Sequence, residues 1–245
     1  MKYIKSISLL ISILLLSACN NVSNNNMKYN EIVKIPEASG ICLRESTNTF
    51  FVANDEWKIY EINPKWKILR KKSIGKYDFE WIVCNEEQKE LYLLIEGTWN
   101  ILPISIDTFK KWKEIILDVS DKDRKKYFNK KAWAEWLAMK GNNLYISTQN
   151  DKNNLLEFEL SDDWKKVEFK NIYDIDSDDL SGMTYYNKLL YILSDKNDKI
   201  YKYSLKEKKI IDKISLKKWD WEWIVLDKKW TIYLADDAWR IVVLK

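Results

Sequence analysis

The feature that most constrains the fold of this chain is a short segment that occurs five times. Each copy begins with a serine or a glutamate, continues with a glycine or a tryptophan, and enters an apolar stretch. The second residues of successive copies are 41, 55, 46 and 41 positions apart. The copies are Ser39–Cys42, Glu80–Val83, Glu135–Ala138, Ser181–Thr184 and Glu222–Val225. Such a period indicates structural units that pack on their neighbours.

Two further apolar segments follow each copy, and each comes after a polar turn. The second strands are expected at Phe50–Ala53, Leu91–Ile95, Leu144–Thr148, Leu189–Ser194 and Ile232–Ala235. The third strands are expected at Lys58–Ile62, Asn100–Ile104, Leu155–Leu160, Lys199–Leu205 and Arg240–Leu244. Four repeats have room for a fourth strand, such as Ile210–Ser215. Short strands at this spacing predict an all-β chain folded as a five-bladed β-propeller.

The last repeat ends after three strands, so another segment has to complete it. Tyr29–Ile35, which precedes the first repeat, is expected to supply its outer strand, close the ring and leave no open sheet edge. The longer second interval is expected to contain a charged, solvated loop at Ser120–Lys131. A β-sandwich is the alternative for a chain of short strands, but it does not explain five repeats in register.

The N-terminus has the pattern of a bacterial export signal. Lys2 and Lys5 precede an apolar run at Ile7–Leu16, which is shorter than a membrane span. The run ends in Leu-Ser-Ala-Cys, which resembles the lipobox of lipoproteins and implies that Cys19 carries lipid. We expect a signal peptide at residues 1–18, a lipidated polar tether at 19–28 and the propeller at 29–245. The protein would then be anchored to a membrane in the cell envelope, outside the cytoplasm; an ordinary signal peptide is the alternative.

The composition excludes several kinds of chemistry. The chain has no histidine, so Ser-His-Asp and Cys-His catalysis and histidine metal ligands are excluded. Its 41 basic residues nearly balance 37 acidic ones, and no basic face is evident, so no nucleic-acid partner is expected. Cys42 and Cys84 each lie in an apolar segment, where buried free thiols are expected rather than a disulfide.

The 13 tryptophans and only five glycines form an unusual composition. The repeat position that holds Gly40 and Gly182 holds a tryptophan in the other three copies, and no ordinary packing position accepts both. Four more tryptophans lie where turns favour glycine: Trp57, Trp66, Trp230 and Trp239. The hypothesis is that UGA codons read as glycine have been written as tryptophan, with Trp219 and Trp221 the least clear cases. The alternative is a tryptophan-rich protein whose aromatic faces stack on sugars.

With glycine at these positions, several segments resemble the SdiA-regulated family of bacterial β-propellers. They are Glu37–Ile41, Asp78–Ile82, Ala134–Ala138, Leu180–Gly182, Leu193–Asp195 and Glu222–Ile224. The likeness covers nearly all of Ile35 to Lys245, and the tryptophans are where this chain departs from it. The resemblance implies five blades, a calcium ion in a shared acidic site, and distant similarity to NHL-repeat and esterase-like phytase propellers. It implies no defined activity.

Acidic residues recur at equivalent places in the repeats. Glu80, Glu135 and Glu222 begin three inner strands, and Ser39 and Ser181 begin the other two. Three acids just precede inner strands, namely Glu37, Asp78 and Asp179, and four follow second strands, namely Asp55, Glu96, Asp195 and Asp236. All-oxygen ligands suit Ca²⁺. The hypothesis is therefore one Ca²⁺ near the channel, bound among Glu80, Glu135, Glu222, Glu96, Asp195 and Asp236.

Other interpretations of these acids remain open. Any single one could cap a strand or a turn instead of binding metal. The run at Asp174–Asp179 lacks the glycine and the distal glutamate of an EF-hand and is interpreted as an inter-blade loop. Two functional classes follow, of which we favour the first. One is a calcium-binding scaffold that binds a protein or small molecule on one propeller face; the other is a calcium-dependent esterase or phosphoesterase, with no catalytic residue indicated by spacing.

Overall fold

The computed structural model of the chain describes residues 33–98, 100–117, 120, 133–149, 154–161, 166–177, 179–236 and 240–244. The predicted signal peptide, the tether with Cys19 and nearly all of the predicted loop at 120–131 lie outside these residues. All regular structure within them is β-strand. Among them, no helix is long and apolar enough to cross a membrane.

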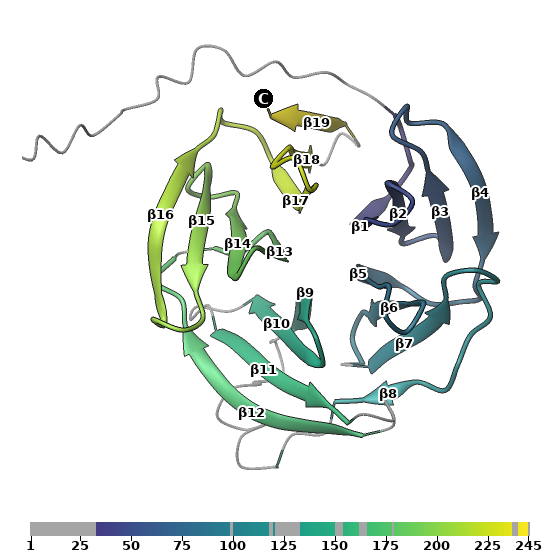
Figure 1. Cartoon of the computed structure of the whole chain (residues 1–245), viewed down its shortest axis with the longest axis horizontal. Coiled ribbons are helices and arrows are strands. Elements are labelled where there is room, and N and C mark those ends of the chain that lie inside the picture. The colour runs from purple at the N-terminus through teal and green to yellow at the C-terminus, as the bar shows by residue number, and fades with distance from the viewer. Residues whose placement is uncertain are drawn as a thin grey trace, which may run out of the picture.

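The strands form five antiparallel sheets arranged as blades around a centre (Figure 1). The first contains β1 (Ala38–Arg44), β2 (Thr49–Asn54), β3 (Lys58–Ile62) and β4 (Ile68–Ser73). The second contains β5 (Phe79–Asn85), β6 (Glu90–Ile95), β7 (Asn100–Ser105) and β8 (Ile115–Ile116). The third contains β9 (Trp133–Lys140), β10 (Asn143–Gln149), β11 (Asn154–Leu160) and β12 (Val167–Asp174). The fourth contains β13 (Gly182–Tyr186), β14 (Leu189–Ser194), β15 (Lys199–Ser204) and β16 (Lys209–Ser215). The fifth contains β17 (Trp221–Leu226), β18 (Ile232–Asp236) and β19 (Ile241–Leu244).

The first strand of each sheet lies nearest the centre, and each contacts the first strand of the next sheet. β1 also contacts β17, so the ring is closed. The predicted five-bladed propeller is confirmed. The predicted second and third strands, and the one fourth strand predicted with bounds, Ile210–Ser215, lie within two residues of the observed ones. The prediction succeeded because short apolar runs bounded by polar turns are a local signal of buried strands.

The fifth sheet has three strands in the described part of the chain. Most of the predicted closing strand, at residues 29–32, lies outside that part, and its described remainder, Val33–Ile35, is not assigned to a strand. Ile35 is nevertheless only 2% exposed and belongs to the largest core cluster, where Val33 packs against it. The segment before the first blade is therefore anchored in the core, and its closing role stays a prediction.

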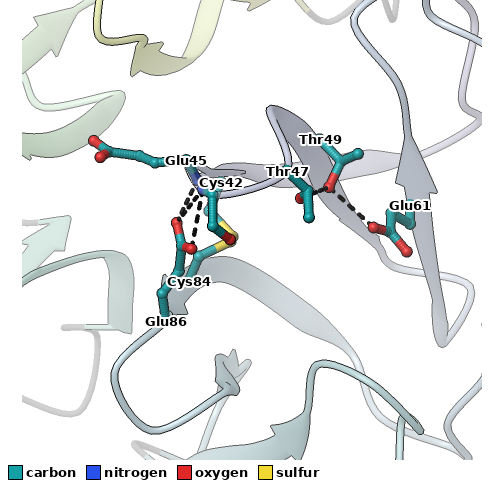
Figure 2. The surroundings of a disulfide bond; sticks show 8 residues. Cys42, Glu45, Thr47, Thr49, Glu61, Cys84 and Glu86 are labelled. Atoms are coloured by element: carbon teal, nitrogen blue, oxygen red, sulfur yellow. Dashed lines mark hydrogen bonds between the residues drawn. A yellow bond between two sulfur atoms is a disulfide. The ribbon is translucent and has the colours of Figure 1, made fainter.

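The expectation of free thiols is wrong, because Cys42 and Cys84 form a disulfide with their Cα atoms 5.7 Å apart (Figure 2). Cys42 lies in β1 and Cys84 in β5, the inner strands of neighbouring blades. The sequence placed each cysteine in an apolar strand, but the pairing depends on how these two strands lie side by side in the ring. That contact is tertiary and has no local signature.

Two further contacts fix the first blade to the second. Glu86, just after β5, accepts hydrogen bonds from the backbone N–H groups of Glu45 and Ser46, the latter at 3.1 Å. On the outer side, Arg70 of β4 bonds to Glu61 and donates to the carbonyl oxygens of Ile106 and, at 2.7 Å, Asp107. The guanidinium also lies 4.1 Å from the ring centroid of Phe109. Since a guanidinium is planar and has five donors, one side chain makes all these contacts.

Five of the described tryptophans illustrate two kinds of place. Trp57, Trp66 and Trp230 lie in turns with φ angles of 68°, 62° and 64°, in the left-handed region that favours glycine. Trp81 and Trp223, by contrast, are buried in extended inner strands, at 1% and 2% exposure. The φ angles at the turn positions thus agree with a requirement for glycine. At the strand positions, by contrast, the tryptophan side chains are part of the hydrophobic core.

Candidate functional site at the acidic mouth of the ring

Strand pairing brings the predicted acidic residues to one end of the ring. In four blades the start of the inner strand pairs with the end of the second strand, as in Ala38 with Asn54 and Phe79 with Ile95. The fifth blade is similar, with Trp221 opposite Asp236. Acids that begin an inner strand and acids that follow a second strand therefore lie at the same mouth of the ring, which we call the acidic mouth.

A recurring contact holds the two acidic sets together. The backbone N–H of Asp55 donates to the carbonyl oxygen of Glu37 at 3.0 Å, and that of Glu96 donates to Asp78 at 3.0 Å. In the fourth blade the N–H of Asp195 donates at 3.2 Å to the side chain of Asp179 instead. The residue after the second strand is thus bonded to a residue just before the inner strand in three blades. This contact fixes the spacing of the carboxylates within each blade.

Glu80 and Glu135 are the centre of the acidic mouth. Burial raises the pKa of Glu80 most. The charges of nearby carboxylates add to this effect and bring the pKa to about 8; in order of importance they belong to Glu135, Glu96, Asp55 and Asp78. Burial likewise raises the pKa of Glu135 to about 7, with contributions from Glu96 and Asp179. Carboxylates from the first four blades therefore act on one pair of half-buried glutamates. Their ionisation in the absence of a cation is unfavourable.

The neighbours of this pair are affected in the same direction. Burial raises the pKa of Asp55 to about 6, and the next cause is the charge of Asp78. The pKa of Glu96 is raised first by a side-chain hydrogen bond to Asp78 and then by burial. A hydrogen bond between two carboxyl groups requires that one of them be protonated. The mouth therefore binds protons at a pH where ordinary carboxyl groups have lost them.

Two of the predicted ligands lie differently. Asp236 is 4% exposed and is neutralised by Arg240, whose Nε donates to it at 2.7 Å. Glu222 is exposed at the start of β17, and the carboxylates that raise the pKa of Glu80 all come from the first three blades. The fifth blade thus contributes an ion pair where the repeat suggested a ligand. The cause is Arg240, which directly precedes β19 of the same blade and donates to Asp236.

The fourth blade supplies Asp195 and a serine. Burial raises the pKa of Asp195, which accepts the N–H of Trp221 at 2.7 Å and lies near Asp179. Ser181, the counterpart of Glu80, is 9% exposed, and its hydroxyl has no hydrogen-bond partner among the residues that the structure describes. In the sequence, Ser181 is notable only because it stands at the position where three other repeats have a glutamate. Its buried hydroxyl adds a polar oxygen to this side of the mouth.

The candidate ligand atoms are of the type that a calcium ion prefers, but the side chains that carry them are too far apart to share one ion. All candidate ligands are oxygen atoms, which Ca²⁺ prefers, and their mutual repulsion favours a bound cation. In the part of the chain that the structure describes, however, no three acidic or cysteine side chains lie close enough to share one metal ion. The glutamate side chains have to rotate toward one another before they can coordinate an ion together.

Comparisons with known proteins identify the fold and no family. No family model matches the chain, and no curated protein is similar to it in sequence. Among the solved structures that match, the glutaminyl cyclase of Myxococcus xanthus has a TM-score of 0.63 and 8% sequence identity, covering 89% of this chain and 95% of that chain. The chain is a five-bladed β-propeller. At this identity the likeness extends to the fold alone, and the similarity to the SdiA-regulated family stays a prediction.

Proposed function

We propose that this protein is a lipid-anchored β-propeller of the cell envelope that binds calcium at its acidic mouth and acts as a binding or scaffold module. The observation that carries the proposal is the pair Glu80 and Glu135, whose pKa values are raised to about 8 and about 7 by burial and by neighbouring carboxylates. A divalent cation would relieve this repulsion and link blades that otherwise repel one another.

Two features support a location outside the cytoplasm. The first is the Leu-Ser-Ala-Cys motif, in which lipid on Cys19 would anchor the chain stably if several acyl chains are attached. The second is the disulfide between Cys42 and Cys84, since disulfides persist in oxidising compartments and are rare in the cytosol. Metabolic labelling with a radioactive fatty acid tests the anchor, and a Cys19→Ala variant should lose the label.

Calorimetry tests the calcium site directly. Titration of Ca²⁺ into the metal-free protein should release heat, raise the Tm and expel protons, because ionised carboxylates bind the metal. Glu135→Gln should weaken binding at least about tenfold, whereas Glu87→Gln, in the exposed turn after β5, serves as the matched control. Absence of both heat and thermal stabilisation would contradict the proposal.

The alternative is a calcium-dependent esterase or phosphoesterase. One observation favours it: a carboxyl group with a pKa near neutrality is suited to general acid or base catalysis, and Glu80 and Glu135 have such values. The glutaminyl cyclase with a similar fold is an enzyme by its name. A screen with p-nitrophenyl esters and phosphoesters, with and without Ca²⁺, separates the two. Turnover that requires Ca²⁺ and is lost in Glu80→Gln would establish the enzyme and displace the scaffold.

We also propose that the chain belongs to the SdiA-regulated family and that its turn tryptophans stand for glycine encoded by UGA. The positive φ angles of Trp57, Trp66 and Trp230 support this, since a tryptophan there is strained and a glycine is not. Peptide mass spectrometry of the natively expressed protein, together with the nucleotide sequence at these codons, is the test. Tryptophan masses at all three turns would refute it.

A further inference from the structure

The opposite mouth of the ring contains a cavity that the acidic mouth does not involve. Its volume is about 290 Å³, and residues from the inner strands of all five blades line it. Its lining comes mainly from the middle and the ends of the inner strands, such as Leu43 and Cys84; Trp81, which follows Glu80 in β5, also lines it, but Glu80 itself does not. The volume is at the lower end of the range for small-molecule sites, enough for a compact ligand.

Sulfur is concentrated in this cavity. Both cysteines of the disulfide line it, and so do Met139 of β9 and Met183 of β13. These four are all the sulfur-bearing residues in the described part of the chain. Sulfur is polarisable, so a wall of this kind favours a ligand that itself contains sulfur or another soft group.

The two cysteines of the disulfide differ in burial. Cys42 is 7% exposed and packs in the core cluster between the first two blades, whereas Cys84 is only half-buried at the edge of that cluster. A thiol that enters the cavity therefore reaches Cys84 more readily than Cys42. The lining contains no lysine or arginine among the described residues. It includes Glu45, which pairs with Lys228 at 3.3 Å, and Glu86, which accepts backbone N–H groups, so a thiol that carries a further negative charge is disfavoured.

The joint between the blades does not depend on the disulfide alone. Glu86 holds the backbone of Ser46 at 3.1 Å, and Arg70 bonds to the carbonyl oxygen of Asp107 at 2.7 Å on the outer side (Figure 2 shows the contact of Glu86). These contacts are non-covalent and do not involve either cysteine. We therefore expect the ring to stay folded when this disulfide is reduced.

We propose that this cavity is a thiol-exchange site in which a small uncharged thiol forms a mixed disulfide with Cys84. The thiolate of the small molecule attacks Sγ of Cys84, the sulfur–sulfur bond breaks, and its electron pair goes to Sγ of Cys42, which takes a proton from water. A second molecule of thiol then attacks the sulfur of the adduct. The two small-molecule sulfurs leave together as a disulfide, and Cys84 is released as a thiol. Two electrons have then passed from the two small thiols to the protein disulfide.

The test uses the full chain with Cys19→Ser, so that only the two propeller cysteines react. It compares 2-mercaptoethanol with 2-mercaptoethanesulfonate, which differ in charge, at equal thiolate concentration. Intact mass and peptide mapping should show an adduct on Cys84, formed at least about fivefold faster with the uncharged thiol. Thr184→Phe, which narrows the cavity from the fourth blade, should slow the reaction at least about fivefold without lowering the Tm.

Three results would overturn the proposal. One is an adduct on Cys42 in place of Cys84. Another is reduction that proceeds only at the rate of global unfolding, measured by hydrogen exchange on the same sample. The third is that the uncharged and the charged thiol react with Cys84 at equal rates. This comparison uses the propeller without a core substitution, so it does not depend on whether a variant folds. Because none of these measurements involves Ca²⁺, the outcome is independent of the proposed calcium site.

Discussion

Gly40 and Trp81 occupy equivalent positions in neighbouring inner strands, and the Cα of Trp81 lies 3.0 Å from the place that a Cβ on Gly40 would take. The backbone nitrogen of Ile82 lies equally close to that place. Gly182 and Trp223 repeat the relationship at 3.0 Å in the fourth and fifth blades. Close approach of neighbouring backbones, rather than an unusual φ angle, therefore requires glycine at these two positions.

The first prediction tests this close approach. Gly40→Ala should lower the free energy of unfolding by about 1–3 kcal/mol, because backbone atoms cannot move away as a flexible side chain can. Urea denaturation measures the change. Gly141, by contrast, has a φ of 56° with nothing within 4 Å of the place that a Cβ would take, so Gly141→Asn should cost little while Gly40→Asn costs more than alanine. Equal costs at both sites would show that packing is not the cause.

The second prediction concerns the turn between β2 and β3. Trp57 has a φ of 68° and is 42% exposed, so Trp57→Gly should raise the free energy of unfolding by about 1 kcal/mol through relief of backbone strain. Trp112 is similarly exposed, at 46%, but its φ is not positive. Trp112→Gly should therefore give no gain. Thermal and urea denaturation of the two variants measure the change in stability. An equal gain in both variants would show that relief of a positive φ angle is not its cause.

The third prediction concerns pH. Glu80 has a pKa of about 8 in the folded protein and an ordinary value of 4.5, so the folded state binds more protons than the unfolded chain between these limits. The free energy of unfolding should therefore fall as pH rises from about 4.5 to about 8 in metal-free protein. Glu80→Gln should flatten the profile and stabilise the protein at pH 8 by about 1 kcal/mol or more.

Glu87→Gln, at an exposed position, is the control for this pH series and should leave the profile unchanged. If calcium binds at the acidic mouth, saturating Ca²⁺ should flatten the wild-type profile as well. If the free energy of unfolding of the wild-type protein rose with pH in metal-free buffer, ionised Glu80 would not be destabilising, and the raised pKa of Glu80 would be contradicted.

The fourth prediction concerns the joint between the first two blades. Arg70→Lys keeps the charge but loses the planar set of donors to Ile106 and Asp107, and should cost about 1–2 kcal/mol. Lys71→Ala, at the exposed neighbouring position in β4, should change stability by no more than about 0.5 kcal/mol. Guanidinium denaturation of both variants measures this, and a lysine that fully replaces Arg70 would show that charge alone suffices.

The sequence by itself determined the five blades, the bounds of most strands and the end of the ring at which the acids gather. These follow from local signals, because alternating burial and polar turns are encoded within each repeat of about 40 residues. Even Ser39 and Ser181 were identified correctly as counterparts of Glu80. Most of what depends on position within one blade could be predicted; the ion pair of Asp236 with Arg240, within the fifth blade, is an exception.

Only the tertiary structure decided the relations between blades. It paired Cys42 with Cys84 and brought Glu80 next to Glu135. Each of these depends on the distance and stagger between elements that the chain connects through intervening strands and turns. A repeat pattern specifies equivalent positions but not which of them approach one another, since that is fixed by packing across the whole ring.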